Sequence, residues 1–211
     1  NHNKVNALYA DLQSLFISDM WASSVEARPG EPYGVIRGKG FVYNDKGQIM
    51  VGTNGLPLKQ SQLLTYGNIT PKWIGGISNS FAYKGWSLYF LIDGRYGGDI
   101  ISGTKLWGTG MGNTINTLNN PFTGATDARE SGILVPGVKP NGTVNDIRVS
   151  AADYWSSVRG IPENVLMDGS YIKLREVSIG YTLPKSLINK MGINSANLSV
   201  YGRNVALLYI S

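Results

Sequence analysis

The sequence offers few side chains that could act in catalysis or bind a metal, and the scarcity of cysteine and histidine excludes several kinds of site. The 211 residues include no cysteine and one histidine, His2, which leaves no thiolate or histidine cluster for a metal site and no ordinary catalytic triad. The carboxylates are not paired, and no nucleophile stands beside a base. We therefore expect a protein that is not an enzyme, with no metal and no cofactor, and we interpret His2 as a solvated terminal residue.

Charge and composition indicate an all-β protein. The net charge is +5 and the isoelectric point about 9.3, but the basic residues are scattered, so no nucleic-acid partner is expected. The sequence combines 27 glycines and 12 tyrosines with only 16% charged residues, which is typical of turn-rich β structure. No apolar run approaches the roughly 18 residues of a spanning helix, so only strands could carry this chain through a membrane.

The aromatic side chains give the strongest signal, in the stretch from Lys72 to Gly97. Two strands are expected here, joined by a tight turn at Lys84 and Gly85. The first strand alternates weakly between apolar and polar residues, and the second alternates cleanly. Because successive strand residues point to opposite sides of a sheet, one face of the second strand collects the apolar side chains of Trp86, Leu88, Phe90, Ile92 and Tyr96.

The aromatic rings repeat at a spacing that fits an outer-membrane barrel. Trp73 and Tyr83 are ten positions apart, as are Trp86 and Tyr96, so each pair shares the apolar face. Ten residues span roughly 33 Å. A tilt of about 40° reduces this to about 25 Å of height, which is the apolar band between two aromatic girdles. An ordinary antiparallel sheet with one buried face would explain the alternation equally well.

The first 71 residues divide into a strand end and a long connection. Residues 1–10 suit the end of a strand, although the leucines of this region would also suit a short helix. Residues 33–52 are expected to form a hairpin that turns at Asn44–Gly47.

The second half contains another long connection and another hairpin. Residues 98–169 are rich in glycine and proline, with short helices expected around 100–106 and 151–158. A strand at 171–184 and an alternating strand at 196–208 follow, joined by a connection with one helical turn that ends at Gly192.

The strand at 171–184 breaks its own alternation. Val177 and Ile179 share one face, whereas Ile172 and Leu174 fall on the opposite parity. Either a bulge lies near Arg175 and Glu176, or the upper end of the strand stands above the apolar zone.

Several stretches together resemble a known family. They are GNITPKWIGGISNSFAYKGWSLYFLIDGRYGGDI, GILVPGVKPNGTVN and SYIKLREVSIGYTLPKSLINKMGINSANLSVYGRNVALLY, with NKVNALYADLQSLFI and VEARPGEPYGVIRGKGFVYNDKGQIMV before them. The chain resembles the C-terminal part of the β-barrel of a SusC/RagA-type TonB-dependent outer-membrane transporter. The resemblance covers essentially all 211 residues, and the last long run is its most specific part.

The resemblance implies an antiparallel transmembrane barrel of about 22 strands, of which this chain supplies about five. Short turns on one side and long extracellular loops on the other fit such a barrel. Residues 1–211 then divide into a strand end at 1–10, a loop at 11–71 that carries the hairpin 33–52, a barrel hairpin at 72–97, a loop at 98–169 and a barrel hairpin at 170–208, with the plug domain absent.

The resemblance also implies a function and partners. The family imports oligosaccharides or peptides across the outer membrane of Gram-negative bacteria, powered through TonB. A SusD-like surface lipoprotein closes over the barrel mouth. Outer-membrane lipid, that lipoprotein, the cargo, and TonB through segments outside this sequence are therefore the implied partners.

Five residues are candidates for cargo binding under this interpretation. Asp93 and Arg95 would face the lumen near the outer rim, where an interior ion pair or a contact to the plug is the plainer role. Trp107, Tyr154 and Trp155 lie in the second long connection. Exposed rings there could stack on sugars or peptide side chains, or serve as packing anchors for the loop or the lipoprotein.

Two other functions stay open on the sequence alone. A soluble β-sandwich carbohydrate-binding module would cover the apolar face around Trp86 and Phe90 with another layer of the same chain. A β-rich hydrolase would require two carboxylates about 5 to 10 Å apart in a cleft.

Overall fold

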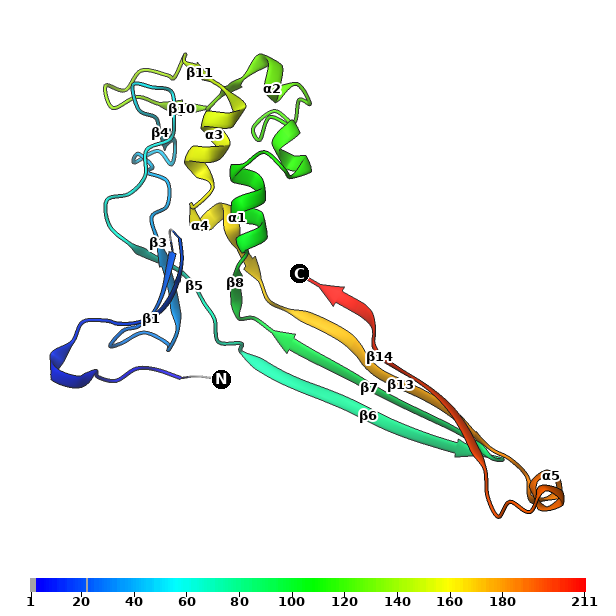
Figure 1. Cartoon of the computed structure of the whole chain (residues 1–211). Coiled ribbons are helices and arrows are strands. Elements are labelled where there is room, and N and C mark those ends of the chain that lie inside the picture. Colours follow the sequence, from blue (N-terminus) through cyan, green and yellow to red (C-terminus); the bar gives the residue numbers. More distant parts are fainter. Residues whose placement is uncertain (1–2, 22) are drawn as a thin grey trace. The chain divides into compact units, whose positions relative to one another are not determined.

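The computed structural model describes residues 3–21 and 23–211, so His2 and the role expected of it lie outside the described residues (Figure 1). The described chain forms two compact units. The sheet unit comprises residues 71–98 and 168–211, and the mixed unit comprises the described residues before 71 together with 99–167. None of the described helices has the length and hydrophobicity needed to cross a bilayer. The chain is rich in strands and its helices are short, which confirms the β-rich composition predicted from the sequence.

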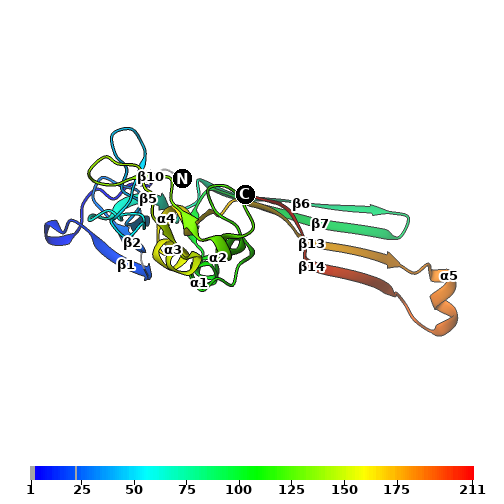
Figure 2. The same cartoon turned by 90° about the horizontal axis from the view of Figure 1, so that it is seen from above.

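The sheet unit is one antiparallel sheet of long strands that lie side by side in both views (Figures 1 and 2). Its strand order is β14-β13-β7-β6. The two hairpins predicted in the sequence are both present, and they pair directly with each other through β7 and β13. The strands are β6 (Trp73–Tyr83), β7 (Trp86–Tyr96), β13 (Tyr171–Thr182) and β14 (Asn197–Ile210).

Turns at one end of this sheet confirm two further predictions. Lys84 and Gly85 join β6 to β7 with φ angles of 47° and 87°, and two positive values in succession match the right-handed twist of the paired strands. The connection from β13 to β14 holds α5 (Lys185–Ile188) and the 3-10 helix η3 (Asn189–Met191). Gly192 ends it in the left-handed conformation, as expected for a helix stop.

A bulge in β13 explains the broken alternation of that strand. Leu174 lies opposite Ile92 of β7, but Glu176, two positions on, lies opposite the adjacent residue Leu91. Arg175 is therefore the extra residue, and it shifts the parity of everything before it. Leu174 returns to the face that carries Ile92 and Phe90, so the structure chooses the bulge over a strand end that rises above the apolar zone.

The mixed unit contains a second antiparallel sheet, of order β1-β2-β3-β5, which the sequence analysis did not predict. Its segments LFISDM and SSVEA mix polar and apolar residues without regular alternation, so no strand period is visible in them. The strands are β1 (Leu15–Met20), β2 (Ser23–Ala27), β3 (Val35–Gly38) and β5 (Leu64–Asn68).

The strand end expected at residues 1–10 is a wrong prediction over its described part. Residues 3–8 form no regular element, and Tyr9–Asp11 form the 3-10 helix η1. Ala10 and Asp11 take φ angles of 52° and 58°, which no extended strand accommodates.

The hairpin expected at 33–52 forms only around its turn. Tyr43 bridges to Ile49, and Asn44 and Gln48 close the turn. The strand before the turn, β3, does not pair across the turn but with β2 and β5. Those after it form β4 (Ile49–Met50), which pairs with β10 (Gly137–Val138) from the other long connection.

Short elements fill the rest of the mixed unit. Helices occur where the sequence predicted them, as α1 (Gly103–Gly110) and α3 (Ala151–Val158), each capped by a serine side chain. The others are β8 (Asp99–Ile101), η2 (Ile115–Leu118), α2 (Ala128–Ser131), β9 (Ile133–Leu134), β11 (Arg148–Val149), α4 (Pro162–Val165) and β12 (Leu166–Asp168).

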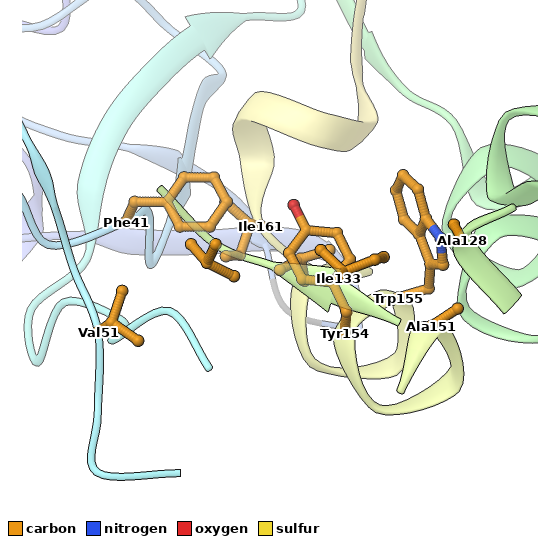
Figure 3. Packing of buried hydrophobic residues seen from close by; sticks show 10 residues of the cluster. Phe41, Val51, Ala128, Ile133, Ala151, Tyr154, Trp155 and Ile161 are labelled. Atoms are coloured by element: carbon orange, nitrogen blue, oxygen red, sulfur yellow. The ribbon is translucent and has the colours of Figure 1, made fainter. Parts of the chain in front are cut away.

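One hydrophobic cluster holds the mixed unit together (Figure 3). Tyr154 and Trp155 of α3 pack edge to face with ring centroids 5.1 Å apart. Phe41 and Val51 come from the first long connection and Ile133 and Ile161 from the second. The two connections, far apart in the sequence, therefore share a single core.

Burial raises the pKa of Tyr154 to about 12, from an ordinary value of 10.0. The folded state therefore favours the neutral phenol, and this stabilisation is complete below a pH of about 10 and declines as the pH rises towards about 12. The parent should lose roughly 2–3 kcal/mol of its free energy of unfolding across this interval. Tyr154→Phe has no phenol to ionise and should not show this loss. Denaturant unfolding at several alkaline pH values tests this, and equal pH dependence in the variant and the parent would contradict it.

Candidate functional site

Aromatic rings lie at both ends of one face of the sheet unit. At one end Trp73 lies opposite Tyr96, with ring centroids 6.4 Å apart. At the other end Tyr83 lies opposite Trp86, and the Trp86 ring is 4.7 Å from that of Tyr181 on the next strand. Trp73 and Trp86 are 52% and 57% exposed, so the rings stand clear of other protein groups over about half of their surface.

The space between these two rows of rings is apolar and exposed. Ile77 lies opposite Ile92, and Phe81 lies opposite Leu88. Side chains of β13 and β14 extend the same face. We call this surface the apolar face; its exposed aliphatic and aromatic members between the rows include Ile77, Phe81, Leu88, Ile179 and Val200.

The opposite face, the polar face, carries an ion pair that the bulge creates. Arg175 donates to the carboxylate oxygen Oδ2 of Asp93 from Nη2 at 2.6 Å and from Nε at 3.2 Å. Its Nη1 donates to Asn204 Oδ1 at 2.8 Å. The remaining oxygen of Asp93, Oδ1, is buried and has no partner among the described residues. Asp93 thus takes the plainer of its two expected roles, that of an ion pair, and its partner Arg175 was not a predicted site residue.

Arg95 performs a different task from Asp93. Its guanidinium donates to the main-chain carbonyl oxygens of Gly97 and Gly98, each at 3.1 Å. Both glycines have positive φ, at 73° and 81°. Arg95 therefore holds the left-handed bend that follows β7.

A hollow of about 240 Å³ lies further along the polar face. Tyr89, Tyr201 and Arg203 all line it. Arg203 forms an ion pair with Glu176 at 3.4 Å, across the strands β13 and β14. Hydroxyl groups and one salt bridge line the hollow, together with Val177 and Gly202.

Trp107, on α1, is a packing residue. Its ring meets that of Trp21 edge to face with centroids 4.7 Å apart, and the guanidinium of Arg159 stands 5.1 Å from its centre. Trp107 itself is half-buried, whereas Trp21 is 66% exposed. The more accessible ring of this pair is therefore Trp21, which the sequence analysis did not select.

Tyr154 and Trp155 are not the exposed rings that the sequence analysis expected. They are only 4% and 8% exposed and belong to the core of the mixed unit. The buried residues of α3 are Ala151, Tyr154, Trp155 and Val158, a spacing that marks the core-facing side of a helix. This periodicity was present in the sequence and would have indicated burial.

We expect Asp93 and Arg175 to be energetically coupled. A double-mutant cycle with Asp93→Asn and Arg175→Gln should give a coupling of about 1–2 kcal/mol in unfolding, because both groups are only partly exposed. The more exposed pair Glu176 and Arg203 is the matched control on the same face, with a coupling below about 1 kcal/mol. Equal coupling energies for the two pairs would contradict a stronger interaction at the bulge.

Sequence comparison gives one informative relative. No protein-family model matches the chain. A stretch of 140 residues is 27% identical to the TonB-dependent receptor P3 of Formosa agariphila, and the match covers 66% of this chain but only 12% of that receptor.

Solved structures show the same fold. The RagAB peptide importer in its closed-closed state matches 99% of this chain with a TM-score of 0.60 and 16% identity. Its open-open state matches the same share with a TM-score of 0.59 and 17% identity. In both cases this chain spans 22% of the matched chain. These comparisons confirm the resemblance found in the motifs: the chain is similar in sequence to a TonB-dependent receptor and shares the fold of part of the RagAB importer.

Proposed function

We propose that this chain forms part of the wall and the outer loops of an outer-membrane barrel that imports nutrients with energy from TonB. The observation that carries the proposal is the exposed apolar face, bounded at both ends by tryptophan and tyrosine rings. Such rings favour the boundary between hydrocarbon and water, and the height between the rows, about 25 Å, is that of a membrane barrel.

The edges of the sheet support the same proposal. Within the described chain, β6 and β14 each pair with a neighbour on one side only. Their outer edges carry main-chain N–H and C=O groups that hydrocarbon cannot satisfy. Closure into a barrel with strands from outside this chain, about 22 in all, would remove both edges.

A soluble carbohydrate-binding sandwich is less well supported. Such a module would bury the apolar face beneath a second layer of the same chain. Ile77 and Val200, in the middle and at one end of that face, are 71% and 74% exposed. A face this open suits lipid better than a protein core.

The sheet and mixed units would then have separate tasks. The polar face of the sheet would line the lumen, and the mixed unit would form the extracellular loops. The peptide importer RagAB is a structural neighbour, which supports peptides as cargo. Oligosaccharides remain the other proposed class, and a SusD-like lipoprotein is the proposed partner. Of the five predicted cargo residues, Asp93, Arg95 and Trp107 retain polar or ring surface that could contribute to binding.

Paired substitutions on adjacent residues of β6 test the membrane assignment. Ile77→Arg places a charge near the middle of the apolar face and should destabilise the barrel by about 2–4 kcal/mol in lipid. Ser78→Arg, on the polar face, should cost far less. Urea unfolding of the full-length protein from vesicles measures both. Equal costs would contradict a lipid-facing apolar face.

Import itself is tested in the source cells. Deletion of the gene for the full-length protein should abolish uptake of labelled oligosaccharide or peptide. Reintroduction of the parent gene should restore uptake. The protein should fractionate with outer membranes and require detergent for extraction. Release as a soluble monomer by salt would overturn the proposal.

A further inference from the structure

A hollow of about 420 Å³ lies in the mixed unit, beside the turn that leads from β1 to β2. Its volume is in the range of pockets that take small molecules, about 300–1,000 Å³. Trp21 lines it, and Phe16 of β1 adds a second aromatic ring. The two residues are 66% and 61% exposed, so both rings have surface free to contact a ligand.

The ring of Trp21 is held in place although its backbone is strained. Trp21 has a φ of 58°, in the left-handed region that bulky residues rarely adopt and that glycine or asparagine fits with less strain. Its ring packs edge to face against Trp107, and Arg159 stands over the Trp107 ring. Strained residues often lie at functional sites. A fixed, exposed ring at a strained position therefore indicates a surface on which a ligand stacks.

Much of the remaining wall of the hollow is polar. Ser23 and Ser24 contribute hydroxyl groups, and Asp19 contributes the single carboxylate of the lining. Asp19 forms no ion pair within the described chain, so its oxygens can accept hydrogen bonds from a ligand. Aromatic rings beside hydroxyl and carboxylate groups suit a pyranose, because one face of such a sugar ring presents C–H groups and its rim presents hydroxyl groups.

Two lysines give the hollow an excess of positive charge. Lys39 and Lys59 both line it, and neither forms an ion pair within the described chain. Partial burial lowers the pKa of Lys59, and the positive charge of Arg159 lowers it further. Cations placed together in this way repel one another, and an anionic ligand would relieve the repulsion. Asp19 offsets only one of these charges.

We propose that this hollow binds an anionic pyranose, a sugar ring that bears a carboxylate or a sulfate group. The C–H face of the sugar contacts Trp21 and Phe16. Lys39 and Lys59 donate charged hydrogen bonds to the anionic group, and Asp19 accepts from the sugar hydroxyls. Identification of this sugar with imported cargo rests on the proposed function, whereas sugar binding does not.

Calorimetric titration of the full-length protein in detergent tests the proposal with D-glucuronate and D-glucose 6-sulfate. D-glucose lacks the anionic group, and D-gluconate keeps a carboxylate on an open chain that has no ring face. We expect at least one anionic sugar to bind about tenfold or more tighter than D-glucose, because of its charged hydrogen bonds. It should bind about two- to tenfold tighter than D-gluconate, because of ring contact. Preference between the two anionic sugars distinguishes a uronic acid from a sulfated sugar.

Substitutions tie the binding to this hollow. Trp21→Asn removes a ring but suits the left-handed backbone, so this variant should fold and should bind about two- to tenfold more weakly. Lys59→Gln should weaken binding of the anionic sugar about tenfold, and Lys59→Arg, which keeps the charge, should retain most of the affinity. Tyr9→Asn and Lys46→Gln are the matched controls. They remove an exposed ring and an exposed charge of the mixed unit that lie outside the hollow, and should leave binding unchanged.

Failure of both anionic sugars to bind would overturn the proposal. Equal binding of D-glucose would contradict the role of charge, and equal binding of D-gluconate would indicate a site for any acid, including an acidic peptide. If each substitution weakens binding no more than its control, the binding lies elsewhere and the assignment to this hollow is wrong. Thermal unfolding of every variant shows whether it is folded. If sugar binding fails while membrane extraction still requires detergent, the sugar site is refuted and the importer proposal stands.

Discussion

The alternation of apolar and polar side chains along four paired strands is the constraint on which the sheet unit depends. Strand pairing fixes which residues lie opposite each other, so rings at the ends of one strand meet rings at the ends of the next. A shift of register by a single residue would exchange the two faces. The apolar face therefore exists only because register is kept through β6, β7, β13 and β14, including across the bulge at Arg175.

The bulge shows how one extra residue serves both faces. On one side it returns Leu174 to the apolar row beside Ile92. On the other it brings Arg175 to Asp93 and Asn204. The cost of an interrupted ladder is offset by a hydrogen-bonded ion pair, and bulges commonly redirect side chains in this way. The ion pair and the continuous apolar face are thus consequences of the same residue.

The mixed unit follows a different principle, because its core is assembled from segments without periodic sequence. Val51 and Ile133 come from different long connections and meet in one cluster. Long loops of this kind are tolerated when they bury side chains of their own.

The sequence by itself determined the long strands, their tight turn and the two short helices, because alternation, glycine turns and helix caps are local signals. It also contained the helical period that buries Tyr154 and Trp155. Only the tertiary structure decided between a bulge and a strand end, selected Arg175 as the partner of Asp93, and revealed the second sheet and the shared core. These features depend on contacts between residues far apart in the chain, and no local pattern encodes which distant segments pair.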